Sequence, residues 1–224
     1  MKSKKALSKK EISAIVIALT LVVYLFVSTS AKIILNPGLP ETPYSSTEAS
    51  VLLKEAKKVS VRKRFNFKKQ YVIFADGIAC AVVEGDFLPV LGDVFTLKAA
   101  NGDKLLTEKE EVFHLNSQAQ FYDNDGNKTI RYERNFTPWS SSDIVSASGT
   151  VTGVYSWSAP FNDKITEADE ETYGITKSFL VNHYEITKNE ETTSNVSIEE
   201  VILMCCIEDA IRGHSSSSSN SNKN

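Results

Sequence analysis

The chain has 224 residues, with 25 Lys and Arg against 28 Asp and Glu and a formal net charge of -3. This balance excludes the strongly basic composition typical of general nucleic-acid binders, so no nucleic-acid partner is expected. Without its apolar N-terminal segment and serine-rich tail, the chain keeps roughly 170 residues, enough for one well-packed core and too few for two. The three cysteines, Cys80, Cys205 and Cys206, do not form the pattern of a disulfide framework.

The N-terminus predicts a membrane segment. Residues 1–11 carry five lysines, and residues 12–31 form an uncharged, mostly apolar run. About 20 helical residues at 1.5 Å each span the roughly 30 Å hydrocarbon core of a bilayer. The run predicts a single-pass anchor in the cell membrane; Thr29-Ser30-Ala31 also fits a signal cleavage site, in which case the chain is secreted. The lysines predict a cytoplasmic N-terminus and an outward-facing domain, with a cytoplasmic domain as the alternative.

The composition divides the rest of the chain into three parts. Residues 32–46 contain Pro37, Pro40 and Pro43 and predict a linker without regular structure. Residues 47–213 form the expected domain. Residues 214–224 are almost entirely serine, asparagine and lysine, and predict a disordered tail.

Three hairpins are predicted in the domain. Residues 71–83, 95–108 and 120–133 each place a strand-like stretch on both sides of a turn dipeptide. The dipeptides are Asp76-Gly77, Asn101-Gly102 and Asp125-Gly126, where glycine supplies the positive φ of a tight turn. Because they recur about every 24 or 25 residues, they predict a meander of antiparallel hairpins.

Other stretches add strands and a short helix. Residues 59–67, 144–155 and 178–187 are rich in β-branched or aromatic residues and each predict one strand. Residues 47–58 have the spacing of a short amphipathic helix.

A buried helix is predicted near the C-terminus. Ser197 and Glu200 have the spacing of a capping box, and Val201–Ile207 is apolar on every face. Arg212 and Gly213 predict the end of this helix. Because seven residues cannot span a bilayer, protein must surround them, which favours a barrel wrapped around the helix or a helix packed between a sheet and its loops.

The order of these elements carries a family resemblance. The hairpins, with Gly92–Leu106 and Tyr122–Gly126 as the clearest stretches, precede the helical segment Ile202–Asp209. This arrangement resembles the tubby C-terminal-like superfamily, including LURP-one-related proteins and phospholipid scramblases. The resemblance covers roughly residues 50 to 213. It implies a mostly β fold, in which an antiparallel β-barrel encloses a C-terminal hydrophobic helix. The N-terminal transmembrane helix predicted above precedes this domain. Tubby domains bind phosphoinositide head groups through basic residues, but no such motif matches position by position here.

One basic stretch is a candidate anion-binding site. Lysines and arginines are dense here and can attract anionic head groups near a membrane, although a solvated surface explains them as well. Besides Lys54, the candidate residues are Lys57, Lys58, Arg62, Lys63, Arg64, Lys68 and Lys69.

No metal, cofactor or catalytic site is predicted. Asp123, Asp125 and Asn127 resemble a calcium loop, but Gly126 precedes the third ligand and Arg134 replaces the closing glutamate, so a hairpin turn is favoured. Nucleophile elbows, phosphate loops and zinc motifs are missing from the sequence.

The expected function is therefore a non-enzymatic binding or scaffolding module at the membrane. Its partner is an anionic lipid, an envelope polymer or another protein. A scramblase-like lipid-handling protein is the alternative.

Overall fold

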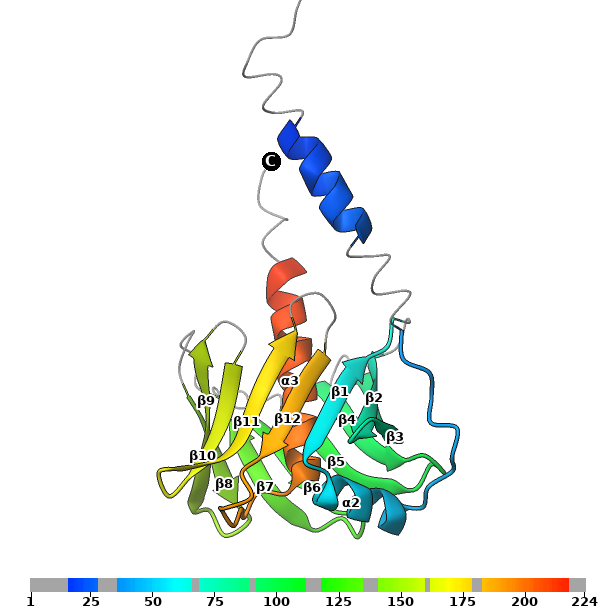
Figure 1. Cartoon of the computed structure of the whole chain (residues 1–224). Coiled ribbons are helices and arrows are strands. Elements are labelled where there is room, and N and C mark those ends of the chain that lie inside the picture. The colour runs from blue at the N-terminus through cyan, green and yellow to red at the C-terminus, as the bar shows by residue number, and fades with distance from the viewer. Residues whose placement is uncertain are drawn as a thin grey trace, which may run out of the picture.

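The structure is a computed structural model that describes residues 16–27, 36–65, 69–88, 92–111, 118–134, 141–159, 162–178 and 183–217. The described residues form twelve antiparallel strands in a closed barrel, in which each strand pairs with its sequence neighbours and β12 pairs with β1 (Figure 1). The strands are β1 Lys58–Lys63, β2 Lys69–Ala75, β3 Ile78–Leu88, β4 Gly92–Ala99, β5 Lys104–Glu111, β6 Gln118–Tyr122, β7 Lys128–Glu133, β8 Ser142–Ser146, β9 Val151–Ala159, β10 Asn162–Glu167, β11 Glu170–Ser178 and β12 His183–Lys188. Closure leaves no unpaired sheet edge among these strands.

The three predicted hairpins are confirmed. They are formed by β2 and β3, by β4 and β5, and by β6 and β7. Their glycines Gly77, Gly102 and Gly126 have φ values of 88°, 95° and 84°. Only glycine adopts such values freely, so local chemistry fixes these turns.

Two predicted strands were wrong in their extent. Residues 144–155 form a hairpin of β8 and β9, because Gly149 turns the chain with a φ of 90°. Residues 178–187 include the last residue of β11 and most of β12, with 179–182 outside the described residues. Strand β10 and most of β11 were not predicted, because their alternating residues include many charged and hydroxyl side chains.

Helix α3, Ile198–Ser217, runs through the barrel (Figure 1). All residues from Val201 to Ala210 are buried, which confirms the barrel around an apolar helix. The predicted end at Gly213 was wrong, since the helix continues to Ser217 and takes in the first residues of the predicted tail. Glycine weakens a helix by about 1 kcal/mol, which the packing of the preceding turns outweighs.

The barrel has two different ends. We call one end distal: it contains the start of β1, the start of α3 and the hairpin turns at Gly77, Gly102 and Gly126. At the proximal end β1 finishes at Lys63 and α3 reaches its C-terminus (Figure 1).

The predicted linker lies along the outside of the barrel. At the proximal end the Asn36 Oδ1 accepts a hydrogen bond from the Phe65 N–H at 2.8 Å. At the distal end the Tyr44 carbonyl accepts one from Asn101 N–H at 3.1 Å. The linker then enters α2, Ser46–Glu55, through a capping box of Ser45 and Glu48. The predicted short helix is thus confirmed.

Only part of the predicted anchor is described. Residues 16–27 form a helix in which every residue is exposed. The ends of the 12–31 run, the N-terminal lysines and residues 218–224 of the tail lie outside the described residues. Among the helices that are described, none is long and apolar enough to cross a membrane.

Candidate functional site

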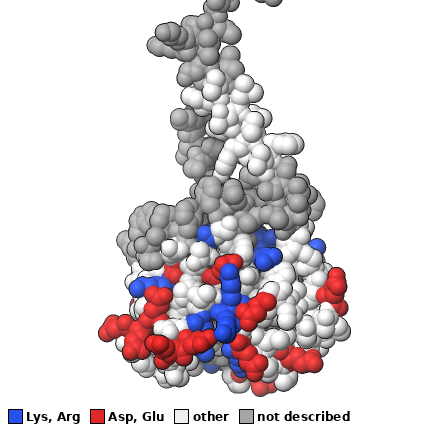
Figure 2. All heavy atoms as spheres, in the orientation of Figure 1, with Lys and Arg blue, Asp and Glu red and all other residues white. Residues whose placement is uncertain are grey.

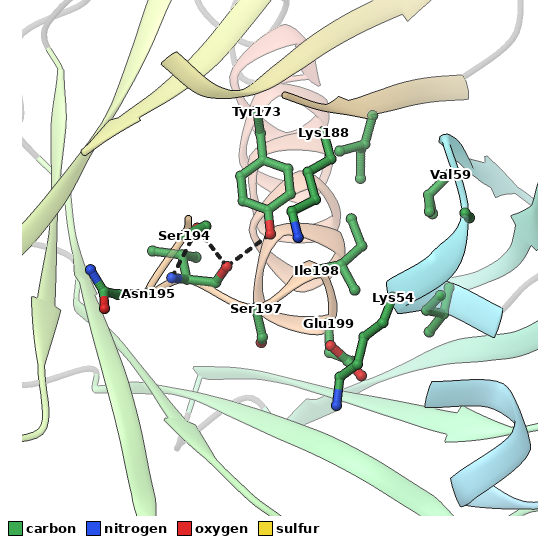
Figure 3. A pocket seen from close by; sticks show the side chains of 13 residues that line it. Lys54, Val59, Tyr173, Lys188, Ser194, Asn195, Ser197, Ile198 and Glu199 are labelled. Atoms are coloured by element: carbon green, nitrogen blue, oxygen red, sulfur yellow. Dashed lines mark hydrogen bonds between the residues drawn. The ribbon is translucent and has the colours of Figure 1, made fainter. Parts of the chain in front are cut away.

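A pocket opens at the distal end, between α2 and the start of α3 (Figure 3). Its volume is about 260 Å³. The wall combines apolar side chains with a few polar groups, as ligand pockets usually do. The lining residues are Leu53, Lys54, Ala56, Val59, Tyr173, Ile186, Lys188, Ser194, Asn195, Val196, Ser197, Ile198 and Glu199.

Hydrogen bonds fix the segment that leads into α3. The Glu167 carboxylate accepts from the Ser194 hydroxyl and from the Asn195 N–H, the latter at 2.8 Å. The Tyr173 hydroxyl donates to the Val196 carbonyl at 2.9 Å. This wall of the pocket is therefore held by groups from β10 and β11.

The predicted capping box starts α3 at the pocket and is confirmed. Ser197 N–H donates to the Glu200 carboxylate at 2.8 Å, and Glu200 N–H donates to the Ser197 hydroxyl at 3.3 Å. The pKa of Glu200 is raised, and burial is the largest cause. The hydrogen bonds from Ser197 act in the opposite direction and lower the pKa. Burial also raises the pKa of Tyr173 to about 12, so its hydroxyl stays protonated as a donor.

The pocket carries charges of both signs. Lys54 and Lys188 are exposed at its rim and form no ion pair within the described part of the chain. The first turn of a helix adds partial positive charge from N–H groups without helical partners. Glu199, on that turn, accepts a hydrogen bond from the Ser50 hydroxyl at 2.6 Å, and its buried Oε2 has no hydrogen-bond partner among the described residues. The pocket lining thus offers ammonium groups at Lys54 and Lys188 and a hydrogen-bond acceptor at Glu199.

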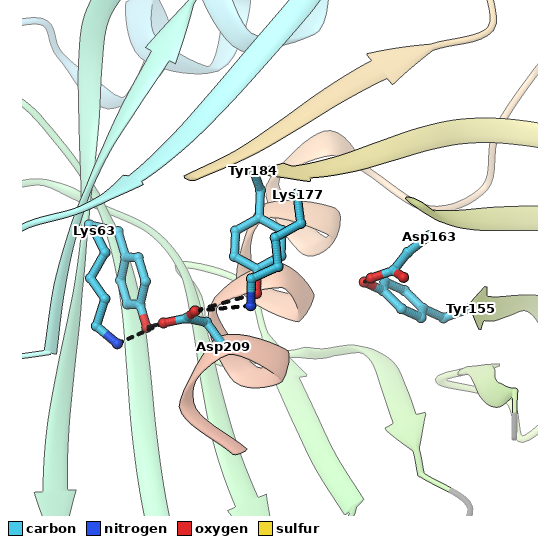
Figure 4. Close-up of polar contacts among 7 residues, drawn as sticks. Lys63, Tyr155, Asp163, Lys177, Tyr184 and Asp209 are labelled. Carbon is cyan, nitrogen blue, oxygen red and sulfur yellow. Dashed lines mark hydrogen bonds and ion pairs between the residues drawn. The ribbon is translucent and has the colours of Figure 1, made fainter. Parts of the chain in front are cut away.

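A second polar cluster surrounds the C-terminal half of α3 (Figure 4). Asp209 lies 2.7 Å from the Lys63 ammonium and 3.6 Å from that of Lys177. The hydroxyls of Tyr71 and Tyr184 donate to it at 3.1 and 3.4 Å. Its side chain is only 4% exposed, so these four partners replace the water that it has lost.

Glu208 is held in the same way on the other side of the helix. Arg134 Nε lies 3.1 Å from its carboxylate, and the Tyr132 hydroxyl donates to it at 3.0 Å. Burial and the adjacent carboxylates raise the pKa of Tyr71 and of Tyr132 well above the usual value. These contacts of Asp209 and Glu208 fasten α3 to the barrel.

The predicted basic stretch is divided between the two faces of the barrel wall. Lys63 points inward to Asp209, whereas its neighbour Arg62 stacks over the Phe74 ring at 4.5 Å. Successive residues of a strand point to opposite faces, so the two cannot contact one ligand together.

The other predicted residues are also dispersed. Lys58 pairs with Glu185 at 2.6 Å, Arg64 donates to Gln70 at 2.9 Å, and Lys69 lies over the Phe95 ring at 5.9 Å. Lys57 is exposed between α2 and β1, and Lys68 lies outside the described residues. On the face drawn in Figure 2, Lys and Arg side chains lie among acidic ones. Anion binding by these seven residues stays a prediction.

The Asp123 loop is a hairpin turn. The Asp123 carboxylate accepts from the N–H groups of Asp125 and Asn127 at 3.0 and 2.8 Å. These bonds lower the pKa of Asp123, with the Asn127 side chain as the first cause. The described residues contain no cluster of three or more His, Cys, Asp or Glu that could bind a metal.

Sequence reasoning missed the pocket and the buried acids. The sequence drew attention to Lys54 as part of the basic stretch, but no pattern pointed to Lys188 or Glu199. The three residues line one pocket only because the fold brings α2, β12 and α3 together. Glu208 and Asp209 did give one, because they follow directly on a fully apolar helical run.

The fold defines a class of proteins in which a closed antiparallel barrel encloses a C-terminal helix. A solved member with this fold is the X-ray structure of the protein AT5G01750 from Arabidopsis thaliana. The two share a TM-score of 0.52 at 12% sequence identity, over 73% of this chain and 98% of the plant protein. No family model and no curated protein matches the sequence. The likeness at this identity is one of fold.

Proposed function

We propose that the chain is a membrane-anchored, non-enzymatic binding module whose ligand site is the distal pocket. The observation that carries this proposal is the pair Lys54 and Lys188, which stand at the rim beside the start of α3 without an ion-pair partner among the described residues. We also assign the chain to the tubby C-terminal-like superfamily, next to the LURP-one-related proteins. The order of hairpins and helix and the fold shared with the Arabidopsis protein support this assignment.

The N-terminal helix supports the membrane anchor. Phe26 is 73% exposed, and the other large apolar side chains of residues 16–27 are exposed as well. A helix that is apolar on every face needs an apolar environment around it. The hydroxyl of Thr20 donates to the Val16 carbonyl at 2.8 Å, which satisfies this polar group within the helix. With the lysines of residues 1–11 inside, the barrel lies outside the cell membrane.

The ligand of the pocket carries an anionic group. Two ammonium groups favour negative charge, and Glu199 adds an acceptor for a hydroxyl or ammonium of the same ligand. A phosphate on a polyol has both features. It occurs in lipid head groups and in anionic envelope polymers.

Titration with sn-glycerol 3-phosphate tests the proposal. The full chain in lipid nanodiscs should show changes in the amide NMR signals of Ile198 and Glu199 as the probe is added. Lys54→Ala and Lys188→Ala should each weaken binding by about fivefold, since one lysine contributes about 1 kcal/mol to anion attraction.

Lys128→Ala is the matched control. Lys128 is an exposed lysine at the distal end that does not line the pocket. The proposal fails if the pocket amides do not respond to the probe, or if Lys128→Ala weakens binding as much as the pocket variants do.

A further inference from the structure

Three buried carboxylates lie at or behind the inner wall of the distal pocket. Glu199 lines the pocket, Glu200 follows it in the first turn of α3, and Glu167 accepts hydrogen bonds from the segment before α3. Their exposed fractions are only 6%, 4% and 6%. Burial is the largest cause of the raised pKa of Tyr173 on this wall, and the charges of all three acids raise that pKa further. The inner wall is therefore electrically negative.

No described side chain neutralises these acids. None of the three forms an ion pair with a lysine or arginine in the part of the chain that the structure describes. By contrast, Asp209 and Glu208 farther along α3 have lysine or arginine partners. The start of a helix supplies only about half an elementary positive charge. Because a buried charge is costly without a partner of opposite sign, this wall favours a cation.

Glu199 is the acid that can receive a cation from the pocket. Its Oε1 accepts the hydrogen bond from Ser50 at 2.6 Å, whereas its buried Oε2 has no hydrogen-bond partner among the described residues. The carboxylates of Glu167 and Glu200 each accept a main-chain N–H, both at 2.8 Å. Figure 3 shows Glu199 among the side chains that line the pocket. Its Oε2 is therefore an open acceptor in the pocket wall.

The positive groups of the pocket lie nearer to solvent. Lys54 and Lys188 are exposed, whereas Glu199 is buried. A ligand with an ammonium at its inner end and an anionic group at its outer end would meet opposite charge at both. A hydroxyl would give Glu199 a hydrogen bond without neutralising it, and a hydrogen bond between ionised groups is about twice as strong as a neutral one. The burial of the acids thus favours an ammonium over a hydroxyl.

We propose that the distal pocket binds an aminoalkyl phosphate, with its primary ammonium at Glu199 and its phosphate toward Lys54 and Lys188. This inference rests on the proposed function and narrows its ligand, because the donor that faces Glu199 is a cation. The same chemistry is present in the head group of an ethanolamine lipid and in a soluble or polymer-borne phosphate ester.

Two matched probes test the inference. O-Phosphoethanolamine and 2-hydroxyethyl phosphate differ only in an ammonium against a hydroxyl. The full chain in phosphatidylcholine nanodiscs is titrated with each, and the amide NMR signals of Ile198 and Glu199 give the affinity. The ammonium probe should bind about tenfold more tightly, because a charge-assisted hydrogen bond replaces a neutral one. Equal affinities, or tighter binding of the hydroxyl probe, would overturn the inference and leave the proposed pocket in place. If neither probe moves these signals, the proposed function fails together with it.

Glu199→Gln identifies the group that creates the preference. The substitution keeps the shape and an acceptor but removes the charge. It should reduce the preference to about twofold or less and leave the affinity for the hydroxyl probe nearly unchanged. Glu55→Gln is the matched control, since Glu55 is an exposed acid at the end of α2 that does not line the pocket. A tenfold preference that survives Glu199→Gln would refute the role of Glu199. The comparison of probes on the wild type needs no variant, so it decides even if Glu199→Gln does not fold.

Nanodiscs that contain phosphatidylethanolamine distinguish the two sources of the ligand. Phosphatidylcholine has no N–H donor on its ammonium, whereas phosphatidylethanolamine has three. If a lipid head group enters the pocket, soluble O-phosphoethanolamine should bind less tightly in the phosphatidylethanolamine discs. An unchanged affinity assigns the site to a soluble or polymer-borne ester. Both results require the wild-type preference for the ammonium probe, and its absence overturns the inference in either case.

Discussion

Replacing Asp209 should strongly destabilise the barrel. Its carboxylate binds two lysines and two tyrosine hydroxyls in the C-terminal half of α3. Asp209→Ala removes all four interactions and leaves two ammonium groups and two hydroxyls without their acceptor. Breaking a buried ion pair costs about 3 to 5 kcal/mol, and each hydrogen bond adds about 1 kcal/mol. Because Lys63 and Lys177 retain partial exposure, they can turn to water, so we expect a loss of about 3 kcal/mol.

Urea unfolding of the full chain in mild detergent, followed by far-UV circular dichroism, measures this loss. With a slope of about 2 kcal/mol per M, the midpoint should fall by about 1.5 M. Asp209→Asn keeps an acceptor for the tyrosines but loses the charge, so its effect should be smaller.

A double-mutant cycle with Lys63→Met separates the ion pair from the packing. The two changes contact each other at 2.7 Å and should couple by about 1 kcal/mol or more. An Asp209→Ala midpoint within about 0.25 M of the wild type would refute the reasoning, since the slope converts this into about 0.5 kcal/mol.

Three further results are expected. Gly85→Ala should cost about 1 to 3 kcal/mol in urea unfolding, because its Cβ would lie 2.6 Å from the Phe95 ring, whereas Gly38→Ala, with no atom within 4 Å, should be nearly neutral; equal effects would contradict this. The three cysteines are free and buried, and burial raises the pKa of Cys80 to about 11, so a thiol reagent at pH 8 should label none in the folded chain and all after denaturation; rapid labelling of the folded chain argues against this burial. Glu200 has a raised pKa in the folded state, so its stabilising contribution is present below the usual value of 4.5 and is lost as the pH rises through the raised value. Glu200→Gln should therefore gain stability relative to the wild type at pH 7.5 but not at pH 4, and a constant difference would exclude this linkage.

The sequence predicted those parts of the fold that depend on local chemistry. Gly77, Gly102 and Gly126 define tight turns through their own backbone freedom, and Ser197 with Glu200 defines the start of α3. The end of α3 was not local. Gly213 is a stop signal in an isolated helix, but here buried turns precede it and the helix continues.

Strands β10 and β11 were missed because their inward faces are not uniformly apolar. Asp163 and Glu167 are buried on β10, and the Tyr155 hydroxyl donates to Asp163 at 2.8 Å. A search for apolar alternation overlooks strands whose buried polar groups receive partners from other strands. The same reason hides the Asp209 cluster, since Lys63 is 146 residues away in the chain.

The candidate pocket was not predicted from the sequence. The density of lysines and arginines from Lys57 to Lys69 predicted an anion-binding site there, but strand alternation places Arg62 and Lys63 on opposite faces of the barrel wall. The structure instead places Lys54 and Lys188 in the lining of one pocket, and no sequence pattern connects the two. A pocket formed by three distant segments needs the closed barrel before it becomes visible.

The side of the membrane on which the pocket lies tests the proposed function most directly. Lys188→Cys places a thiol at the pocket rim, in a chain whose own cysteines are buried, and Ser3→Cys marks the N-terminus. Intact expressing cells are treated with a membrane-impermeant maleimide, before and after permeabilisation. If the barrel faces outward, Lys188→Cys is labelled in intact cells and Ser3→Cys is labelled only after permeabilisation. Labelling of Lys188→Cys only after permeabilisation would contradict an outward-facing binding module.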